Sequence, residues 1–178
     1  MGKLYFVRHG ETVWNVENKI CGATDSPLTE YGHKQAQETG ENILSQGIEA
    51  DKILYSPLSR AKDTALHIAR ITGIDAMEEP RLFEQRFGKW EGTARNGEGF
   101  KEAKTHFADN YEGGESMLKV AHRVYSLLDE ITDQDDKTYI LVAHNGIARV
   151  VQSYFFDMTN EEYATFGVKN CQVLTYEF

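Results

Sequence analysis

Three short apolar segments, each followed by a helical pattern, constrain the fold of this chain more than any other feature. We predict strands over residues 3–7, 51–55 and 139–143, and the first and third of these are apolar almost throughout. Strands of this kind are typical of a parallel sheet whose two faces are both covered by helices. The alternation of strands and helices therefore predicts an α/β fold with a mainly parallel sheet.

Helix signals lie between the predicted strands. Thr29 is expected to cap a helix that runs to about Gln46, and Ser56-Pro57 has the pattern of an N-cap followed by the first helical residue. Further helices are predicted over residues 100–109, 116–131 and 147–156, and further extended segments over residues 75–77 and 173–176. The chain has no linker or repeat, so we expect one domain over residues 1–178.

The net charge and the cysteine content argue against several classes of function. The formal net charge is −9 at pH 7, which argues against a nucleic-acid partner and against an anionic membrane surface. Cys21 and Cys171 form no CxxC pair, which fits a reducing compartment. The chain shows no export signal and no apolar stretch of membrane-spanning length, so we expect a cytoplasmic protein with no membrane partner.

Cationic and imidazole side chains follow the predicted strands. Arg8 and His9 follow the first strand, Arg60 lies shortly after the second, and His144 follows the third. We expect these side chains to lie close together, because ligands bind where the carboxyl ends of parallel strands meet. The guanidinium of arginine donates two parallel hydrogen bonds to the oxygens of one phosphate, and a neutral imidazole is a nucleophile toward phosphorus. The pattern predicts phosphoryl chemistry in which one histidine attacks and the other, protonated, stabilises the equatorial oxygens.

Phosphoryl transfer to a histidine also needs a carboxyl group that protonates the leaving oxygen. The irregular segment over residues 81–104 contains three candidates, Glu84, Glu91 and Glu98. Their residue type alone does not separate them.

A series of motifs extends over almost the whole chain in one order. The motifs are Leu4-Tyr5-Phe6-Val7-Arg8-His9-Gly10-Glu11-Thr12, Asp25-Ser26-Pro27-Leu28-Thr29, Ser56-Pro57-Leu58-Ser59-Arg60-Ala61, Arg81-Leu82-Phe83-Glu84, Gly88-Lys89-Trp90-Glu91-Gly92, Gly113-Gly114-Glu115-Ser116 and Val142-Ala143-His144-Asn145-Gly146. Together they resemble the histidine phosphatase superfamily, which includes the cofactor-dependent phosphoglycerate mutases. An isolated Arg-His-Gly would be a weak signal, whereas the ordered series is specific. The resemblance implies a three-layer α/β/α sandwich with a mixed, mostly parallel central sheet.

The resemblance also implies roles for individual residues. His9 becomes a phosphohistidine, and Arg8, Arg60 and His144 bind the phosphoryl group. Glu84 protonates the leaving group and then activates water, a proton transfer that contributes roughly 10²–10⁴-fold to the rate. The resemblance implies no metal ion and no cofactor, because arginine and histidine supply the positive charge.

Asn15 and Asn145 complete the predicted substrate-binding residues. By resemblance, Asn15 contacts phosphate or orients the site from the first loop. The start of a helix beside Asn145 would add backbone N–H groups that favour an anion. The chain departs from the family at residues 19–22, where it has Lys-Ile-Cys-Gly and the family often has Arg-x-Gln-Gly.

The segment 93–111 is predicted to form a short lid, and its length bears on the function. Phosphoglycerate mutases have a longer insertion here, so this cleft should be more open to water, which hydrolyses a phosphoenzyme. We therefore predict a metal-independent phosphatase that hydrolyses small phosphomonoesters through a phosphohistidine intermediate. The alternatives are mutase-type phosphoryl transfer and a non-catalytic module that binds phosphorylated ligands. Arg95, Lys101 and Lys104 are predicted to form a solvated face.

Overall fold

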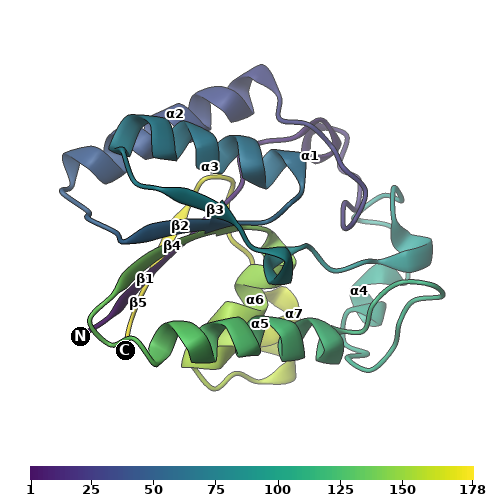
Figure 1. Ribbon diagram of the computed structural model, residues 1–178. Helices are drawn as coiled ribbons and strands as arrows, with labels where there is room; N and C mark the ends of the chain where they lie inside the picture. The colour runs from purple at the N-terminus through teal and green to yellow at the C-terminus, as the bar shows by residue number, and fades with distance from the viewer.

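A five-stranded sheet lies at the centre of the computed structural model, which describes residues 1–178 (Figure 1). Its strand order is β3-β2-β4-β1-β5. All neighbouring strands pair in parallel except β1 and β5, which are antiparallel. The predicted mixed, mostly parallel sheet is therefore confirmed. The strands are β1 (Lys3–Arg8), β2 (Lys52–Tyr55), β3 (Ala76–Glu78), β4 (Thr138–Ala143) and β5 (Val173–Glu177).

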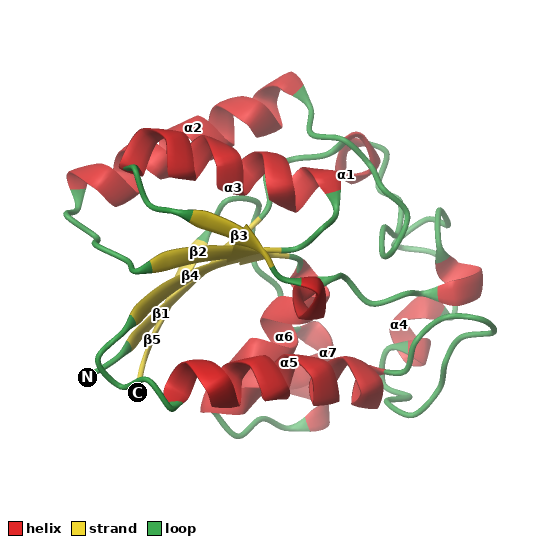
Figure 2. Ribbon diagram, viewed as in Figure 1, coloured by secondary structure: helices red, strands yellow, loops and turns green.

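Helices cover both faces of this sheet, as the alternating pattern predicts (Figure 2). One face carries α2 (Glu30–Ser45) and α3 (Ser59–Thr72), and the other carries α5 (Met117–Thr132), α6 (Asn145–Phe155) and α7 (Asn160–Thr165). Short helices lie on the connecting segments beyond the carboxyl ends of the parallel strands, where the candidate site is found. They are α1 (Val13–Val16), η1 (Pro80–Leu82), η2 (Gly88–Trp90) and α4 (Phe100–Ala103).

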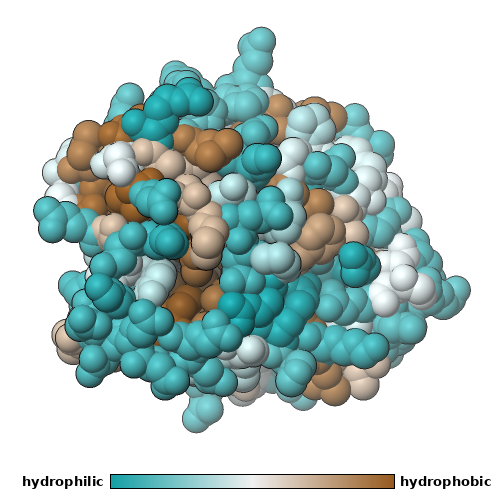
Figure 3. Space-filling model, in the orientation of Figure 1, coloured by the Kyte–Doolittle hydropathy of each residue, from teal (hydrophilic) through white to brown (hydrophobic).

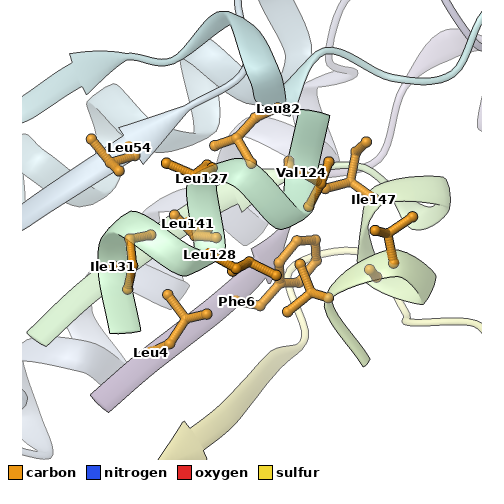
Figure 4. Packing of buried hydrophobic residues seen from close by; sticks show 14 of the residues in the cluster. Leu4, Phe6, Leu54, Leu82, Val124, Leu127, Leu128, Ile131, Leu141 and Ile147 are labelled. Carbon is orange, nitrogen blue, oxygen red and sulfur yellow. The ribbon is translucent and has the colours of Figure 1, made fainter. Parts of the chain in front are cut away.

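Two apolar layers hold the helices to the sheet. The larger one lies between the sheet and α5 and α6, where Phe6 and Leu141 of the strands meet Leu128 and Ile131 of α5 (Figure 4). The smaller one lies under α2 and α3 and includes Ile53. Burying one such side chain stabilises the fold by about 1.5–3 kcal/mol, so the two layers fix the positions at which the strands end.

Local signals account for several helix ends. Thr29 and Ser116 cap α2 and α5, and each side chain accepts a hydrogen bond from the backbone N–H three residues later. Gly73 ends α3 with a φ of 76°, a left-handed conformation that glycine adopts without strain. The helices predicted from Thr29 and over residues 116–131 are confirmed to within one or two residues.

The start predicted for the helix that follows β2 is wrong. α3 begins at Ser59 rather than at Ser56-Pro57, and its N-cap, Leu58, provides no side-chain hydrogen bond. Asp25, from a distant loop, accepts the hydrogen bond of the Ser59 backbone N–H at 3.2 Å instead. A tertiary hydrogen bond to Asp25 therefore replaces the local N-cap of α3. The Ser56 side chain does not cap this helix.

Three further elements differ from the sequence-based expectations. The helix predicted over residues 100–109 ends at Ala103, since the chain continues in turns. α1 and α7 were not predicted, and both begin with a capping box at a threonine, Thr12 and Thr159.

The surface seen in Figure 3 is mainly hydrophilic, and its apolar residues form small patches among polar ones. None of the helices combines the length and the apolar composition that a membrane span requires.

Candidate active site

His9 lies directly after β1 and is almost fully buried, with 5% of its surface exposed. Its Nδ1 atom lies 2.7 Å from the carbonyl oxygen of Gly10. A carbonyl oxygen only accepts hydrogen bonds, so Nδ1 carries the proton of the neutral ring and Nε2 has the free lone pair. Burial, together with the charges of Arg60 and Arg8, holds the pKa of His9 well below its usual value. The ring is therefore neutral and nucleophilic at neutral pH.

His144 occupies the equivalent position after β4, the parallel neighbour of β1. The backbone register pairs Arg8 with Ala143, which places the next residues, His9 and His144, side by side. Their ring centroids lie 5.3 Å apart, and His144 is completely buried.

The protonation state of His144 differs from the expectation. Burial and the charge of Arg60 hold the pKa of His144 well below its usual value, with His9 and Arg8 adding smaller effects. The expected imidazolium is therefore a neutral imidazole when no anion is bound. An anion beside the ring would reverse this effect, because it favours the charged form.

Ser56 contacts His144 from the end of β2. Its Oγ atom lies 2.7 Å from Nε2 of His144 and accepts a hydrogen bond of 3.4 Å from the Leu58 backbone N–H. The hydroxyl hydrogen of Ser56 is then free to be donated to Nε2, an arrangement that places the ring proton of His144 on Nδ1. Sequence reasoning missed this role because it assigned Ser56 to a helix cap.

Two arginines lie beside the histidines. Arg60 is 1% exposed and donates hydrogen bonds to the carbonyl oxygens of Thr24 at 3.0 Å and Gly22 at 2.7 Å. Arg8 donates to the carbonyl oxygen of Val168. Burial lowers the pKa of Arg8 to about 10, which leaves its guanidinium charged at neutral pH. Backbone carbonyls accept the short hydrogen bonds of these two cations. Asp25, whose side chain is 50% exposed, also lies 3.8 Å from Arg60 and forms an ion pair with it.

Three buried nitrogen atoms at this site lack a hydrogen-bond partner: Nε of Arg8, Nε of Arg60 and Nδ1 of His144. Buried polar groups are nearly always paired, and leaving one unpaired costs about 1–3 kcal/mol. Each of the three can donate a proton, and a tetrahedral oxyanion offers several acceptors. The predicted phosphoryl-binding residues are thus brought together, and their unused donors suit an anion.

Glu84 lies at the wall of the same site and is 3% exposed. One of its carboxylate oxygens accepts the Gln85 backbone N–H at 2.9 Å, and the other accepts the Gly146 backbone N–H at 3.1 Å. The approach to Gly146 is so close that a Cβ atom there would lie 2.4 Å from Oε1 of Glu84. Glycine at the start of α6 therefore makes room for this carboxylate.

The structure separates Glu84 from the two other acidic candidates. Glu91 accepts hydrogen bonds from three backbone N–H groups, those of Gly22, Ala23 and Phe87. Its carboxylate holds the loop that in turn binds Arg60, which is a structural function. Glu98 is exposed at the rim of the cavity described below.

The two predicted asparagines make contacts within the protein. The side-chain oxygen of Asn15 accepts from the Thr12 backbone N–H at 3.0 Å and from Asn170 at 3.2 Å. The side-chain oxygen of Asn145 accepts from the Val168 backbone N–H at 2.8 Å. Both residues shape loops around the site, and Asn145 also lines the adjoining cavity.

A cavity of about 1010 Å³ adjoins the histidines. Glu84, Asn145 and Gly146 form part of its wall, whereas His9 and His144 do not. Residues 95–101 and 104–105 of the predicted lid also line it, and so does Arg149 of α6. The solvated face expected for the basic residues of the lid is wrong for Lys104, which is partly buried. Sequence reasoning missed Arg149, although its position four residues after Asn145 places both on the same face of a helix. No group of three or more His, Cys, Asp or Glu side chains is arranged to hold a metal ion.

Solved structures with the same fold include two phosphatases. A mycobacterial glucosyl-3-phosphoglycerate phosphatase is 27% identical, with a TM-score of 0.83, over 97% of this chain and 88% of the other. A phosphoserine phosphatase from Entamoeba histolytica, solved with 3-phosphoglyceric acid, is 30% identical, with a TM-score of 0.82, over 98% and 90% of the two chains.

Relatives and a family model agree with this likeness. Proteins from Salmonella, such as that of Salmonella paratyphi B, carry the name probable phosphoglycerate mutase GpmB and are 36% identical over 155 residues, or 83% of this chain and 71% of theirs. The model of the histidine phosphatase superfamily (branch 1) matches residues 4–178. With a mostly parallel sheet that brings two histidines and two arginines together at its carboxyl edge, this chain belongs to the histidine phosphatase superfamily.

Proposed function

We propose that this protein is a metal-independent phosphatase that hydrolyses small phosphomonoesters through a phosphohistidine on His9. The observation that supports this most is the hydrogen bond from Nδ1 of His9 to the carbonyl oxygen of Gly10, which leaves Nε2 unprotonated. The ring centroid of His144 lies 5.3 Å from that of His9, and the charges of Arg60 and Arg8 act on His9, so the unpartnered donors of these three residues belong to the same site. A nucleophile next to unused donors is what phosphoryl transfer requires.

In the first step, a bond forms between Nε2 of His9 and phosphorus while the ester P–O bond breaks. Arg8, Arg60 and His144 bind the phosphoryl oxygens, and the dianion favours the protonated form of His144. Glu84 donates its proton to the leaving oxygen, and the alcohol departs through the adjoining cavity, whose wall Glu84 forms.

In the second step, a water molecule attacks the phosphorus of the phosphohistidine. Glu84 accepts a proton from this water, and the P–N bond to His9 breaks. Inorganic phosphate is released and the starting state is restored. A lid over residues 93–111 admits this water, since residues 93–99 are exposed to solvent. The phosphatases among the solved structures with this fold support hydrolysis.

Phosphoglycerate mutase activity is the second candidate, because the Salmonella relatives carry that name at 36% identity. In a mutase, the phosphoryl group on His9 would pass to a second hydroxyl of the substrate instead of to water. Conversion of 3-phosphoglycerate to 2-phosphoglycerate in the presence of a bisphosphate primer tests this candidate directly.

The primary test is phosphate release from p-nitrophenyl phosphate in the presence of EDTA. Wild type should release phosphate, and His9→Ala should not. His122→Ala is the matched control, because His122 is an exposed residue of α5 that does not line the adjoining cavity. Equal release by wild type and His9→Ala would overturn the proposal, and loss of activity with EDTA would overturn metal independence.

A further inference from the structure

The tautomer of His9 depends on the direction of one backbone carbonyl, that of Gly10. Nδ1 of the His9 ring lies 2.7 Å from this oxygen, and the hydrogen bond between them is what keeps the ring proton on Nδ1. Glycine has no Cβ atom, so its backbone adopts many more φ and ψ values than that of other residues. Gly10 by itself therefore does not fix the direction of its carbonyl, and other groups of the protein must do so.

Thr64 holds the N–H of Gly10 from α3. It is completely buried and lies one turn after Arg60. Its Oγ1 atom accepts a hydrogen bond of 3.0 Å from the Gly10 backbone N–H and donates one of 2.8 Å to the carbonyl oxygen of Arg60. A hydroxyl has a single hydrogen, so the bond to Arg60 leaves the lone pairs of Oγ1 for Gly10. One side chain thus links the backbone beside the nucleophile to the backbone of Arg60.

Asn170 holds the carbonyl of His9 from the turn before β5. Its Nδ2 atom donates a hydrogen bond of 2.9 Å to the His9 carbonyl oxygen and one of 3.2 Å to the side-chain oxygen of Asn15. The His9 carbonyl and the Gly10 N–H belong to the same peptide group, which is planar. Thr64 and Asn170 therefore hold opposite ends of one rigid unit, and its orientation is determined from both sides.

Close packing leaves this task to hydrogen bonds rather than to a side chain at position 10. A Cβ atom on Gly10 would lie 2.5 Å from the carbonyl oxygen of Gly32, which is backbone of α2. A residue with a more restricted backbone therefore does not fit here. The site needs glycine for its small size, and the hydrogen bonds offset the conformational freedom that comes with it.

We infer that Thr64 and Asn170 are positioning residues for the nucleophile. Together they fix the His9–Gly10 peptide group, so that the Gly10 carbonyl keeps the proton of His9 on Nδ1 and leaves Nε2 free to attack phosphorus. The two residues touch neither the substrate nor the reacting atoms, and they act through the backbone alone. This inference rests on the proposed function, in which Nε2 of His9 is the nucleophile.

Replacement of Thr64 tests the inference by kinetics. Thr64→Val removes the hydroxyl at nearly constant shape, and kcat/KM for p-nitrophenyl phosphate should fall about tenfold to a hundredfold because the nucleophile is misplaced. Thr64→Ser keeps the hydroxyl and should recover most of the loss. The inhibition constant of inorganic phosphate should stay unchanged in Thr64→Val, since Arg8, Arg60 and His144 are still present. A parallel loss of phosphate affinity would show that Thr64 only supports the fold.

Thr72→Val is the matched control for Thr64→Val. Thr72 lies at the other end of α3, where its hydroxyl donates a hydrogen bond of 2.8 Å to the carbonyl oxygen of Ile68, four residues earlier. It has the same local contact as Thr64 and no contact with Gly10, so kcat/KM should not change.

Asn170→Ala tests the other end of the peptide group and does not depend on the folding of Thr64→Val. It should also lower kcat/KM about tenfold to a hundredfold with unchanged inhibition by phosphate. Asn42→Ala, at an exposed position of α2, is its control. Wild-type kcat/KM in both Thr64→Val and Asn170→Ala overturns the inference.

Nuclear magnetic resonance separates this inference from the proposed function, because it needs no turnover. Long-range ¹H–¹⁵N spectra of ¹⁵N-histidine-labelled protein distinguish a protonated from an unprotonated ring nitrogen, and His9→Gln assigns the signals of His9. Wild type should have the proton on Nδ1, and Thr64→Val and Asn170→Ala should populate both tautomers. If this change occurs in a protein that hydrolyses no phosphomonoester, the positioning role stands and the phosphatase proposal fails. An unchanged tautomer in both variants overturns the positioning role, whatever their rates.

Discussion

The Nε2 atom of His144 lies 2.7 Å from the hydroxyl oxygen of Ser56, although the two residues are 88 positions apart. The parallel pairing of β2 with β4 brings them together at the ends of adjacent strands. The hydrogen bond fixes the orientation of the His144 ring through Nε2 and leaves Nδ1 without a partner in the protein, so Nδ1 is available to the proposed phosphoryl group. Ser56 is therefore a positioning residue for His144.

Replacement of Ser56 tests this relationship. Ser56→Ala should lower kcat for p-nitrophenyl phosphate about tenfold to a hundredfold, because a hydrogen bond that supports a developing charge contributes roughly 1.5–3 kcal/mol. Ser56→Thr keeps the hydroxyl and should recover part of the loss. Ser45→Ala, at the exposed end of α2, should have no effect. A wild-type kcat in Ser56→Ala would show that the contact does not matter for turnover.

Glu84→Gln should slow the release of a poor leaving group far more than that of a good one. Release of glycerol from glycerol 3-phosphate in a single turnover should fall roughly 10²–10⁴-fold, since the proton donor is lost. Release of p-nitrophenolate, which is stable as an anion, should fall much less. Glu91→Gln is the matched control, because its carboxylate binds backbone N–H groups only.

The control has its own expected result. Glu91→Gln should lower the free energy of unfolding by about 1–3 kcal/mol, measured by urea denaturation, because one of the two acceptor oxygens becomes an NH2 donor and at least one backbone N–H group loses its acceptor. Any change in its rate should be equal for the two leaving groups. If Glu91→Gln rather than Glu84→Gln shows the leaving-group effect, the two roles are reversed.

Gly146→Ala should impair the enzyme by moving Glu84. The added Cβ would lie 2.4 Å from Oε1 of Glu84, so the carboxylate must shift. A misplacement of this kind lowers the rate by about 10²-fold. Alanine itself is favourable within a helix, so the secondary structure of α6 should persist in circular dichroism. Full single-turnover activity with glycerol 3-phosphate would contradict the assigned position of Glu84.

The stability of the ligand-free protein should fall as the pH falls below about 6.5. His9 and His144 have lowered pKa values when folded, so the unfolded chain binds more protons below its own histidine pKa of about 6.5. Each histidine lowers the free energy of unfolding by at most about 1.4 kcal/mol for each pH unit below about 6.5. This loss of stability continues until the pH reaches the pKa of that histidine in the folded protein.

Urea denaturation between pH 7 and pH 5 measures this slope. His9→Gln should reduce the slope by the contribution of one histidine, because one of the two titrating rings is removed. Orthovanadate, a phosphate analogue, should also reduce it, because a bound anion raises the pKa of both rings in the folded state. A slope in His9→Gln as steep as that of wild type would show that His9 does not titrate as proposed.

Metal independence and the assignment of the chain to one domain remain predictions. The EDTA assay tests the first of these, and a single cooperative unfolding transition, seen by two spectroscopic probes, would support the second.

Local patterns were enough to predict most of the fold. The apolar strands, the caps at Thr29 and Ser116 and the neighbours Arg8 and His9 are all readable within a few residues of chain. The strand ends then meet at one edge because parallel strands share a direction, which brought His144 and Arg60 into the predicted site. The resemblance to a family separated Glu84 from Glu91 by position alone.

The sequence by itself therefore determined the sheet, its helical layers and which residues are candidates for phosphoryl chemistry, because these depend on periodicity, on short-range capping and on the ends of the strands. Only the tertiary structure decided what Ser56, Glu91 and Thr64 do. Their hydrogen bonds join residues that lie far apart in the chain, and burial at each contact sets the charge state and the available partners. Such contacts exist only after packing has placed the elements, so no local pattern could specify them.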